Sequence, residues 1–187
     1  MITVMCVGAL KEVHWRDACA EYLKRLRGVS VVEVDEERLP AVPSAAEIAR
    51  GMEKEGERLL EVARGKGTTS AGKATAFQRK RTTEKSVAAD AGKETGQGAC
   101  RIALCVEGAA MGSEELAAFL EEKQARGFSH VAFFIGGSYG LSDKVKNACG
   151  LRLSLSAMTL PHGLARVMLL EQLYRAQQIN GGGKYHK

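Results

Sequence analysis

The chain has 187 residues, of which 45% are hydrophobic and 26% are charged, as is typical of a globular protein of one domain. No run approaches the roughly 18 apolar residues of a membrane span, and the short apolar N-terminus meets Lys11 and Glu12 too soon for a signal peptide. The five cysteines form no Cys-x-x-Cys pair, and an odd number of thiols is typical of a reducing compartment. We therefore expect a cytoplasmic protein that does not enter membranes.

The formal net charge of +5 is concentrated in two regions. Residues 65–99 hold seven Lys/Arg against three Asp/Glu, and residues 151–187 hold five Lys/Arg against one Glu. The rest of the chain is mildly acidic. Basic clusters attract phosphate backbones at long range, but composition alone leaves open whether these regions contact RNA or form a solvated surface.

The first third of the chain alternates between strand and helix patterns. Residues 2–7 are apolar and predict a strand, and apolar residues at helical spacing predict a helix over 15–26. Residues 29–34 are rich in β-branched side chains and predict a second strand.

A capping box and a glycine delimit the next helix. Ser44 is followed three residues later by Glu47, which predicts a helix over 45–63 that ends at Gly65. Residues 65–99 are rich in Gly, Ala, Thr, Ser and Lys and hold almost no aliphatic side chains. Because such a segment cannot bury enough apolar surface to offset the entropy of ordering it, we expect a disordered basic insertion within a single domain.

The same alternation resumes after the insertion, at Arg101. The expected elements are strands over 102–106, 130–135 and 151–155, a helix over 113–126 capped by Ser113, a short helix from Ser142, and a helix from Pro161 to about 179. Strands that alternate with helices favour an α/β fold with a mostly parallel sheet and helices on both faces.

Three segments follow the carboxyl ends of predicted strands, where parallel sheets bind their ligands. They are residues 104–108, 135–142 and 155–162. In the second, Gly136 and Gly137 directly follow a buried strand, so that a ligand or another backbone can approach closely. The pattern is neither the Rossmann fingerprint nor a phosphate loop with its lysine. A tight strand-to-helix turn is the commoner meaning of such an isolated motif.

The last predicted helix is apolar around most of its circumference. Its apolar residues are Leu164, Val167, Met168, Leu169, Leu170 and Leu173. A helix of this kind is buried on several sides, which in a small domain predicts a subunit interface. Glu171 and Arg175 have the spacing of a helical ion pair, and the alternatives of structural pairing and RNA contact stay open for Arg175.

Four motifs occur together in a specific order. They are IGGSYGLS at 135–142, LSLSAMTLPH at 153–162, EQLYRA at 171–176, and the ending Tyr185-His186. Together with the first strand and the early helix, they resemble the RlmH (YbeA-like) family of SPOUT methyltransferases. The resemblance covers the whole chain except residues 65–99.

The resemblance implies a homodimer of α/β subunits with a C-terminal trefoil knot, a feature that sequence patterns cannot reveal. It also implies that S-adenosylmethionine, without a metal, is used to methylate ring nitrogen 3 of a pseudouridine in 23S ribosomal RNA of the assembled ribosome. Carried over by position, the cofactor pocket consists of Leu104, Gly136, Leu155, Ser156, Ala157, Met158, Thr159 and Leu160, to which we add Gly137 on steric grounds. Adenine and methionine need a mostly apolar slot with backbone hydrogen bonds, which these loops can supply.

Methyl transfer requires the attacking nitrogen in line with the sulfonium carbon, so positioning supplies much of the rate. The target imide must also lose its proton, and His186 is our candidate base, with Tyr185 beside it. Arg166 is the third candidate catalytic residue, and we expect it, like Arg175, to hold phosphate or the edge of the target base. Arg175 and Lys184 are the candidates for RNA binding. The four histidines are scattered, so no metal ligands are predicted.

Two residues depart from the pattern of the family. Cys105 stands where an acidic residue is frequent, and Lys184 replaces a frequent proline before the Tyr-His ending. Three alternatives stay open: a SPOUT enzyme that acts on tRNA or on a ribose hydroxyl, a ribosome-binding factor without catalysis, and a doubly wound nucleotide-dependent enzyme. The lack of a phosphate motif disfavours the last of these.

Overall fold

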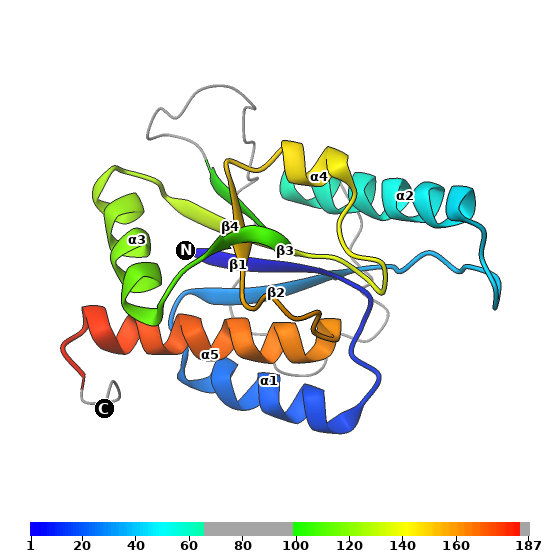
Figure 1. Cartoon of the computed structure of the whole chain (residues 1–187). Coiled ribbons are helices and arrows are strands. Elements are labelled where there is room, and N and C mark those ends of the chain that lie inside the picture. Colours follow the sequence, from blue (N-terminus) through cyan, green and yellow to red (C-terminus); the bar gives the residue numbers. More distant parts are fainter. Residues whose placement is uncertain (66–98, 184–187) are drawn as a thin grey trace.

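The computed structural model describes residues 1–65 and 99–183. Within them, five parallel strands form one sheet in the order β2-β1-β4-β3-β5. The strands are β1 (Ile2–Val7), β2 (Val29–Val34), β3 (Ala99–Ala110), β4 (His130–Ile135) and β5 (Leu151–Ser154). Figure 1 shows the sheet between two layers of helices. The expected α/β fold with a parallel sheet is therefore confirmed, whereas the knot stays a prediction.

The helices divide between the two faces of the sheet. They are α1 (Val13–Arg25), α2 (Ala45–Ala63), α3 (Ser113–Ala125), α4 (Asp143–Asn147) and α5 (His162–Asn180). Helix α5 contacts α1 and α3 on one face, and α2 contacts α4 on the other (Figure 1). This arrangement leaves the carboxyl ends of the strands to the connecting loops.

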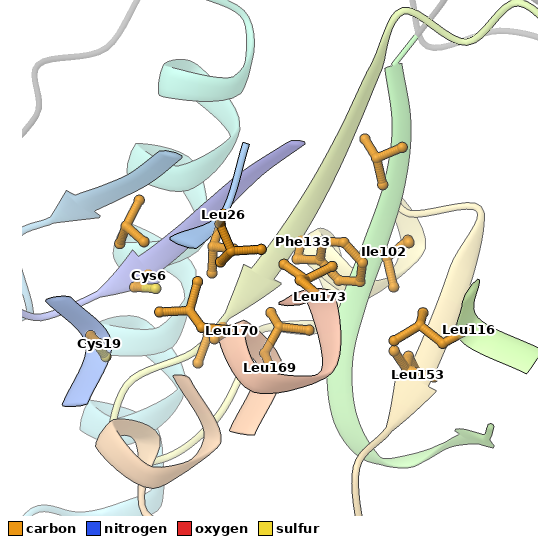
Figure 2. Packing of buried hydrophobic residues seen from close by; sticks show 14 of the residues in the cluster. Cys6, Cys19, Leu26, Ile102, Leu116, Phe133, Leu153, Leu169, Leu170 and Leu173 are labelled. Atoms are coloured by element: carbon orange, nitrogen blue, oxygen red, sulfur yellow. The ribbon is translucent and has the colours of Figure 1, made fainter. Parts of the chain in front are cut away.

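Side-chain alternation along the strands divides the core into two clusters. Cys6 and Phe133 face α5, where they belong to the same cluster as Leu170 (Figure 2). Met5 and Phe134, their neighbours in sequence, face α2 and α4. Every residue of β4 is buried, as expected for a strand covered on both sides.

Part of the apolar circumference of α5 is buried within one chain. Leu169, Leu170 and Leu173 have no solvent exposure and pack in the cluster formed by the sheet, α1 and α3 (Figure 2). Leu164, Val167 and Met168 are only partly buried, so the subunit interface and the homodimer stay predictions.

Strand β3 is longer than the sequence pattern indicates. It continues past the predicted end at residue 106, with an irregularity in its pairing with β5, where Leu153 is the partner of both Leu104 and Ala109. The residues between these two partners leave the ladder as a bulge, and the strand then resumes. The predicted boundary was wrong because the bulge interrupts the apolar pattern without ending the pairing.

The N-terminus of α3 also differs from the prediction. Gly112, not Ser113, is the N-cap, and its N–H donates to the Glu115 carboxylate over 2.6 Å. The Ser113 hydroxyl instead donates to Gln172 of α5 over 2.6 Å. A tertiary hydrogen bond has therefore taken the side chain that local propensity assigned to the cap.

The capping box of α2 is confirmed. The Glu47 N–H donates to the Ser44 hydroxyl over 3.3 Å, and the Ser44 N–H donates to the Glu47 carboxylate over 2.8 Å. We expect Ser44→Ala to lower the free energy of unfolding by about 1 kcal/mol, because one helix-terminal N–H loses its acceptor. Chemical denaturation measures this. Ser44→Asp is the control and should stay close to the wild type, and equal stability of the Ala and Asp variants would contradict the prediction.

Two further predictions concern the basic insertion and membrane spans. The predicted basic insertion at 65–99 lies, apart from its end residues, outside the described residues. Within residues 1–65 and 99–183, no helix has the length and apolar character needed to cross a membrane.

Candidate functional site

A cavity of about 730 Å³ lies at the carboxyl ends of β3, β4 and β5. Its size falls within the roughly 300–1,000 Å³ of small-molecule sites. Three segments line most of it, residues 104–107, 135–141 and 154–162, apart from Ala157 in the last. These are the strand ends that the sequence singled out. Lys146 of α4 and Ala165 of α5 complete the lining.

The bulge of β3 forms one wall of the cavity. Cys105, Val106 and Glu107 lie in the part of β3 between the two partners of Leu153, and all three line the cavity. The strand can return to β5 only because residue 108 is glycine, since a Cβ there would lie 2.5 Å from the Leu153 carbonyl carbon. The bulge thus places the Glu107 carboxylate beside the ligand space.

The Gly-Gly loop after β4 forms the second wall. A Cβ on Gly136 would lie 2.2 Å from the Gly140 carbonyl carbon, so no other residue fits without moving the backbone. Gly140 has a φ of 86°, and its N–H donates to the Gly137 carbonyl over 3.1 Å. The motif therefore forms a tight turn and also lines the cavity, as both interpretations of the sequence predicted.

The loop after β5 forms the third wall and is fixed by short-range hydrogen bonds. The Ser154 hydroxyl donates to the Ser156 carbonyl over 2.9 Å, and the Met158 N–H donates to the Ser156 hydroxyl over 3.0 Å. Met158 itself is 74% exposed at the cavity. The loop leaves apolar side chains free to contact a ligand.

The cavity brings together the predicted cofactor-binding residues with one exception. The lining includes Leu104, Gly136, Gly137, Leu155, Ser156, Met158, Thr159 and Leu160. Ala157 is exposed in the same loop but does not line the cavity. Their role in binding a cofactor stays a prediction.

Sequence reasoning did not select several other lining residues. Among them are Cys105, Val106, Glu107, Ser138, Tyr139, Lys146 and His162. The strand-end rule signalled the segments that hold most of them. Lys146 gave no such signal, because its side chain reaches the cavity from a helix that begins beyond the Gly-Gly loop.

The cavity contains an ion pair and a neutral thiol. Lys146 lies 2.6 Å from the Glu107 carboxylate, and this hydrogen bond holds the pKa of Glu107 below its usual range. Burial, with a smaller effect of the Glu107 charge, raises the pKa of Cys105. The carboxylate is therefore ionised at neutral pH, and the thiol is a poor nucleophile.

Arg166 lies elsewhere than its predicted role requires. It is 1% exposed and does not line the cavity. Its guanidinium donates to the Glu33 carboxylate over 2.5 Å and to the Gly8 carbonyl over 2.9 Å. Direct contact with RNA is thus not supported, and the side chain instead holds α5 against the ends of β1 and β2.

The other predicted catalytic and RNA-binding residues have mixed outcomes. Arg175 is partly buried and donates two hydrogen bonds to the Glu171 carboxylate, of 3.0 and 2.6 Å, which confirms their pairing. Contact between Arg175 and RNA stays a prediction. Lys184, Tyr185 and His186 lie outside the described residues.

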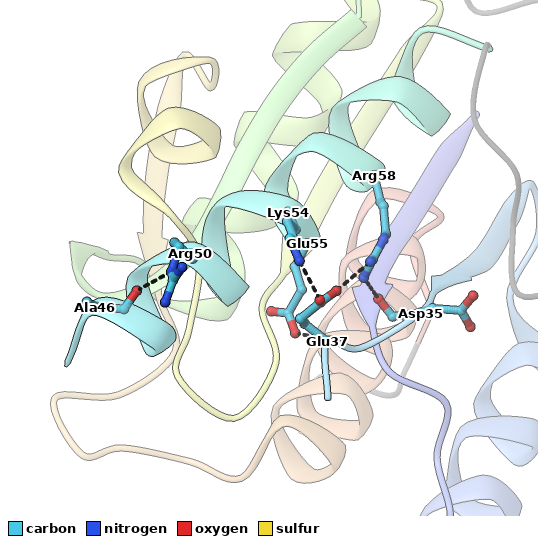
Figure 3. Close-up of polar contacts among 7 residues, drawn as sticks. All are labelled: Asp35, Glu37, Ala46, Arg50, Lys54, Glu55 and Arg58. Carbon is cyan, nitrogen blue, oxygen red and sulfur yellow. Dashed lines mark hydrogen bonds and ion pairs between the residues drawn. The ribbon is translucent and has the colours of Figure 1, made fainter. Parts of the chain in front are cut away.

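A polar network joins α2 to the segment that follows β2 (Figure 3). The Glu37 carboxylate accepts from Lys54 over 2.8 Å and from Arg58 over 2.5 Å, and the Glu37 N–H donates to Glu55 over 2.8 Å. The second oxygen of Glu55 would lie 3.3 Å from a Cβ on Gly137. The Glu55 carboxylate therefore lies next to Gly137, and burial raises its pKa.

The fold and site define a class of protein. A cavity at the carboxyl ends of parallel strands, beside a glycine loop, is typical of α/β proteins that bind nucleotide-like ligands. The described residues contain no group of three or more His, Cys, Asp or Glu that could hold a metal ion. Residues 66–186 match the family model described as predicted SPOUT methyltransferase.

The chain is similar over almost its full length to proteins named ribosomal RNA large subunit methyltransferase H. It is 39% identical to the ribosomal RNA large subunit methyltransferase H of Bifidobacterium animalis subsp. lactis (strain AD011), with 100% of this chain and 99% of that protein covered. It is 41% identical to the protein of the same name from Pelotomaculum thermopropionicum (strain DSM 13744 / JCM 10971 / SI), with 99% and 98% covered. The chain therefore belongs to the SPOUT methyltransferase family, and within it to the group of these relatives, which confirms the resemblance seen in the sequence.

A solved structure supports the fold alone. A probable methylase family protein from Haemophilus influenzae Rd KW20 matches with a TM-score of 0.50 and 12% identity, over 100% of this chain and 70% of that chain.

Proposed function

We propose that this chain methylates ribosomal RNA of the large subunit, with S-adenosylmethionine as the methyl donor. The observation that carries the proposal is the full-length similarity to relatives named ribosomal RNA large subunit methyltransferase H. The cavity at the strand ends supports it, because it offers a ligand site of suitable size within the family's fold. As the finer proposal, the target is ring nitrogen 3 of a pseudouridine in 23S ribosomal RNA of the assembled ribosome.

The lining residues fit this cofactor. S-adenosylmethionine supplies an activated methyl group on its sulfonium. Leu104, Leu155 and Leu160 provide apolar surface for an adenine ring, and the absence of side chains at Gly136 and Gly137 allows close approach to the backbone. The rigid turn at Gly136 fixes the cavity wall before the ligand arrives, which favours catalysis by positioning.

The remaining roles are proposed on the resemblance. His186, with Tyr185, removes or orients the proton of the target imide, and Arg175 and Lys184 contact the RNA. Arg166 contributes indirectly, through its hold on Gly8 and Glu33. The protein acts in the cytoplasm as a homodimer of single-domain subunits, each interrupted by the basic insertion at 65–99.

Transfer of a labelled methyl group tests the substrate. Assembled ribosomes, isolated large subunits and bulk tRNA are incubated in parallel with labelled S-adenosylmethionine, and the product nucleoside is identified by mass spectrometry. We expect label in a 23S pseudouridine, with ribosomes preferred over free subunits. Label confined to tRNA would contradict the substrate. Cofactor binding without any transfer would favour a ribosome-binding factor that lacks catalysis.

A further inference from the structure

One charged pair stands out in the otherwise apolar and neutral cavity. Among the described residues that line it, Glu107 and Lys146 are the two with a formal charge at neutral pH when histidine is counted as neutral. Their charged atoms are 2.6 Å apart. The pair joins the bulge of β3 to α4, so two different elements place opposite charges beside the ligand space.

Lys146 is the less exposed partner. Its side chain is 17% exposed, against 49% for Glu107, and its second acidic neighbour, Asp143, lies 3.9 Å away and is 88% exposed. The ammonium group of a lysine held in this position donates hydrogen bonds in a fixed direction, unlike that of a fully solvated lysine. The half-exposed carboxylate opposite remains accessible to a ligand.

The pair is not needed to anchor α4. The same short helix carries Lys144, which lies 2.8 Å from Glu57 of α2. Val145 between the two lysines is fully buried in the core cluster of this face. Apolar packing and the Lys144 pair thus hold α4 in place, and Lys144 does not line the cavity.

We infer that Glu107 and Lys146 recognise the amino-acid end of the methyl donor, with Glu107 accepting from its ammonium group and Lys146 donating to its carboxylate. The inference rests on the proposed use of S-adenosylmethionine. The ammonium and carboxylate groups of the ligand are attached to one carbon. When the ligand binds, the ammonium can replace Lys146 as the partner of Glu107, and the carboxylate can replace Glu107 as the partner of Lys146. Neither charge is left without a partner in this exchange, because each gains a charged hydrogen bond to the ligand.

The remaining lining leaves the other end of the ligand to apolar contacts. Leu104, Leu155 and Leu160 offer surface that suits adenine and ribose carbons. The charged pair therefore discriminates between adenosine thioethers with and without an amino-acid end.

Calorimetric titration with two such thioethers tests the inference. S-adenosylhomocysteine retains the ammonium and carboxylate groups, and 5′-methylthioadenosine lacks both. The wild type is compared with Glu107→Gln and Lys146→Met, and Lys144→Met is the matched control on the same helix. We expect each of the two cavity variants to bind S-adenosylhomocysteine roughly 10-fold more weakly, as for loss of a charged hydrogen bond. Their affinity for 5′-methylthioadenosine should stay unchanged, and Lys144→Met should match the wild type for both ligands.

The other outcomes overturn the inference. An equal loss of affinity for both thioethers would show that the pair only shapes the cavity, and unchanged affinity for both would show that it does not touch the ligand. If the wild type bound neither thioether, the proposed cofactor itself would be wrong. Binding of 5′-methylthioadenosine by a variant also demonstrates that its cavity is folded.

Discussion

Gly136→Ala is expected to abolish measurable cofactor binding and to reduce methyl transfer at least about 100-fold. The added Cβ would lie 2.2 Å from the carbonyl carbon of Gly140 and 2.7 Å from the Leu141 nitrogen. These neighbours are backbone atoms and cannot rotate away, so the loop that lines the cavity has to move. A displacement of about 1 Å at a reacting centre is enough to cause a loss of this size. Titration with S-adenosylhomocysteine and initial rates of methyl transfer measure the two effects.

Gly150→Ala is the matched control, because a Cβ at that position meets no atom within 4 Å. It should retain wild-type binding and activity. Thermal unfolding of both variants separates a displaced loop from a general loss of folding. Wild-type affinity for S-adenosylhomocysteine in Gly136→Ala would contradict the placement of the cofactor against this loop.

Arg166→Met is expected to lower the free energy of unfolding by about 3 kcal/mol. The variant retains most of the aliphatic volume but removes the donors to the Glu33 carboxylate and the Gly8 carbonyl. Loss of one partner of a buried ion pair typically has an effect of about 3–5 kcal/mol. We expect the lower end because the Glu33 side chain is 33% exposed. Chemical denaturation with a two-state fit provides the measurement.

Arg126→Met serves as the control for charge removal. Arg126 lies 3.0 Å from Glu122 and both side chains are about half exposed, so the change should stay within about 1 kcal/mol. If Arg166→Met instead kept wild-type stability and lost only methyl transfer, Arg166 would be a direct contact of the substrate. The structural role assigned to its buried guanidinium would then be wrong.

The elements that the sequence predicted best are those determined by local patterns. The predicted bounds of β1, β2 and β4 coincide with those observed, because each is a short run rich in apolar or β-branched side chains. The bounds of α2 also coincide, since the Ser44 and Glu47 side chains define its start. The strand-end rule then located the three walls of the cavity.

The features that sequence reasoning missed depend on distant partners. The bulge of β3 is set by its pairing with Leu153, and the side chain of Ser113 is engaged by Gln172 of α5. The positive charge of Arg166 made it a candidate RNA contact, but its partner Glu33 lies 133 positions earlier in the chain. No local window contains such information.

A crystal structure of the protein with S-adenosylhomocysteine tests the central claim most directly. We predict that the adenosine part lies between Leu104, the Gly136 turn and the loop of residues 155–160, with the amino-acid end at Glu107 and Lys146. A ligand bound outside this cavity would contradict the assignment of the strand ends as the cofactor site.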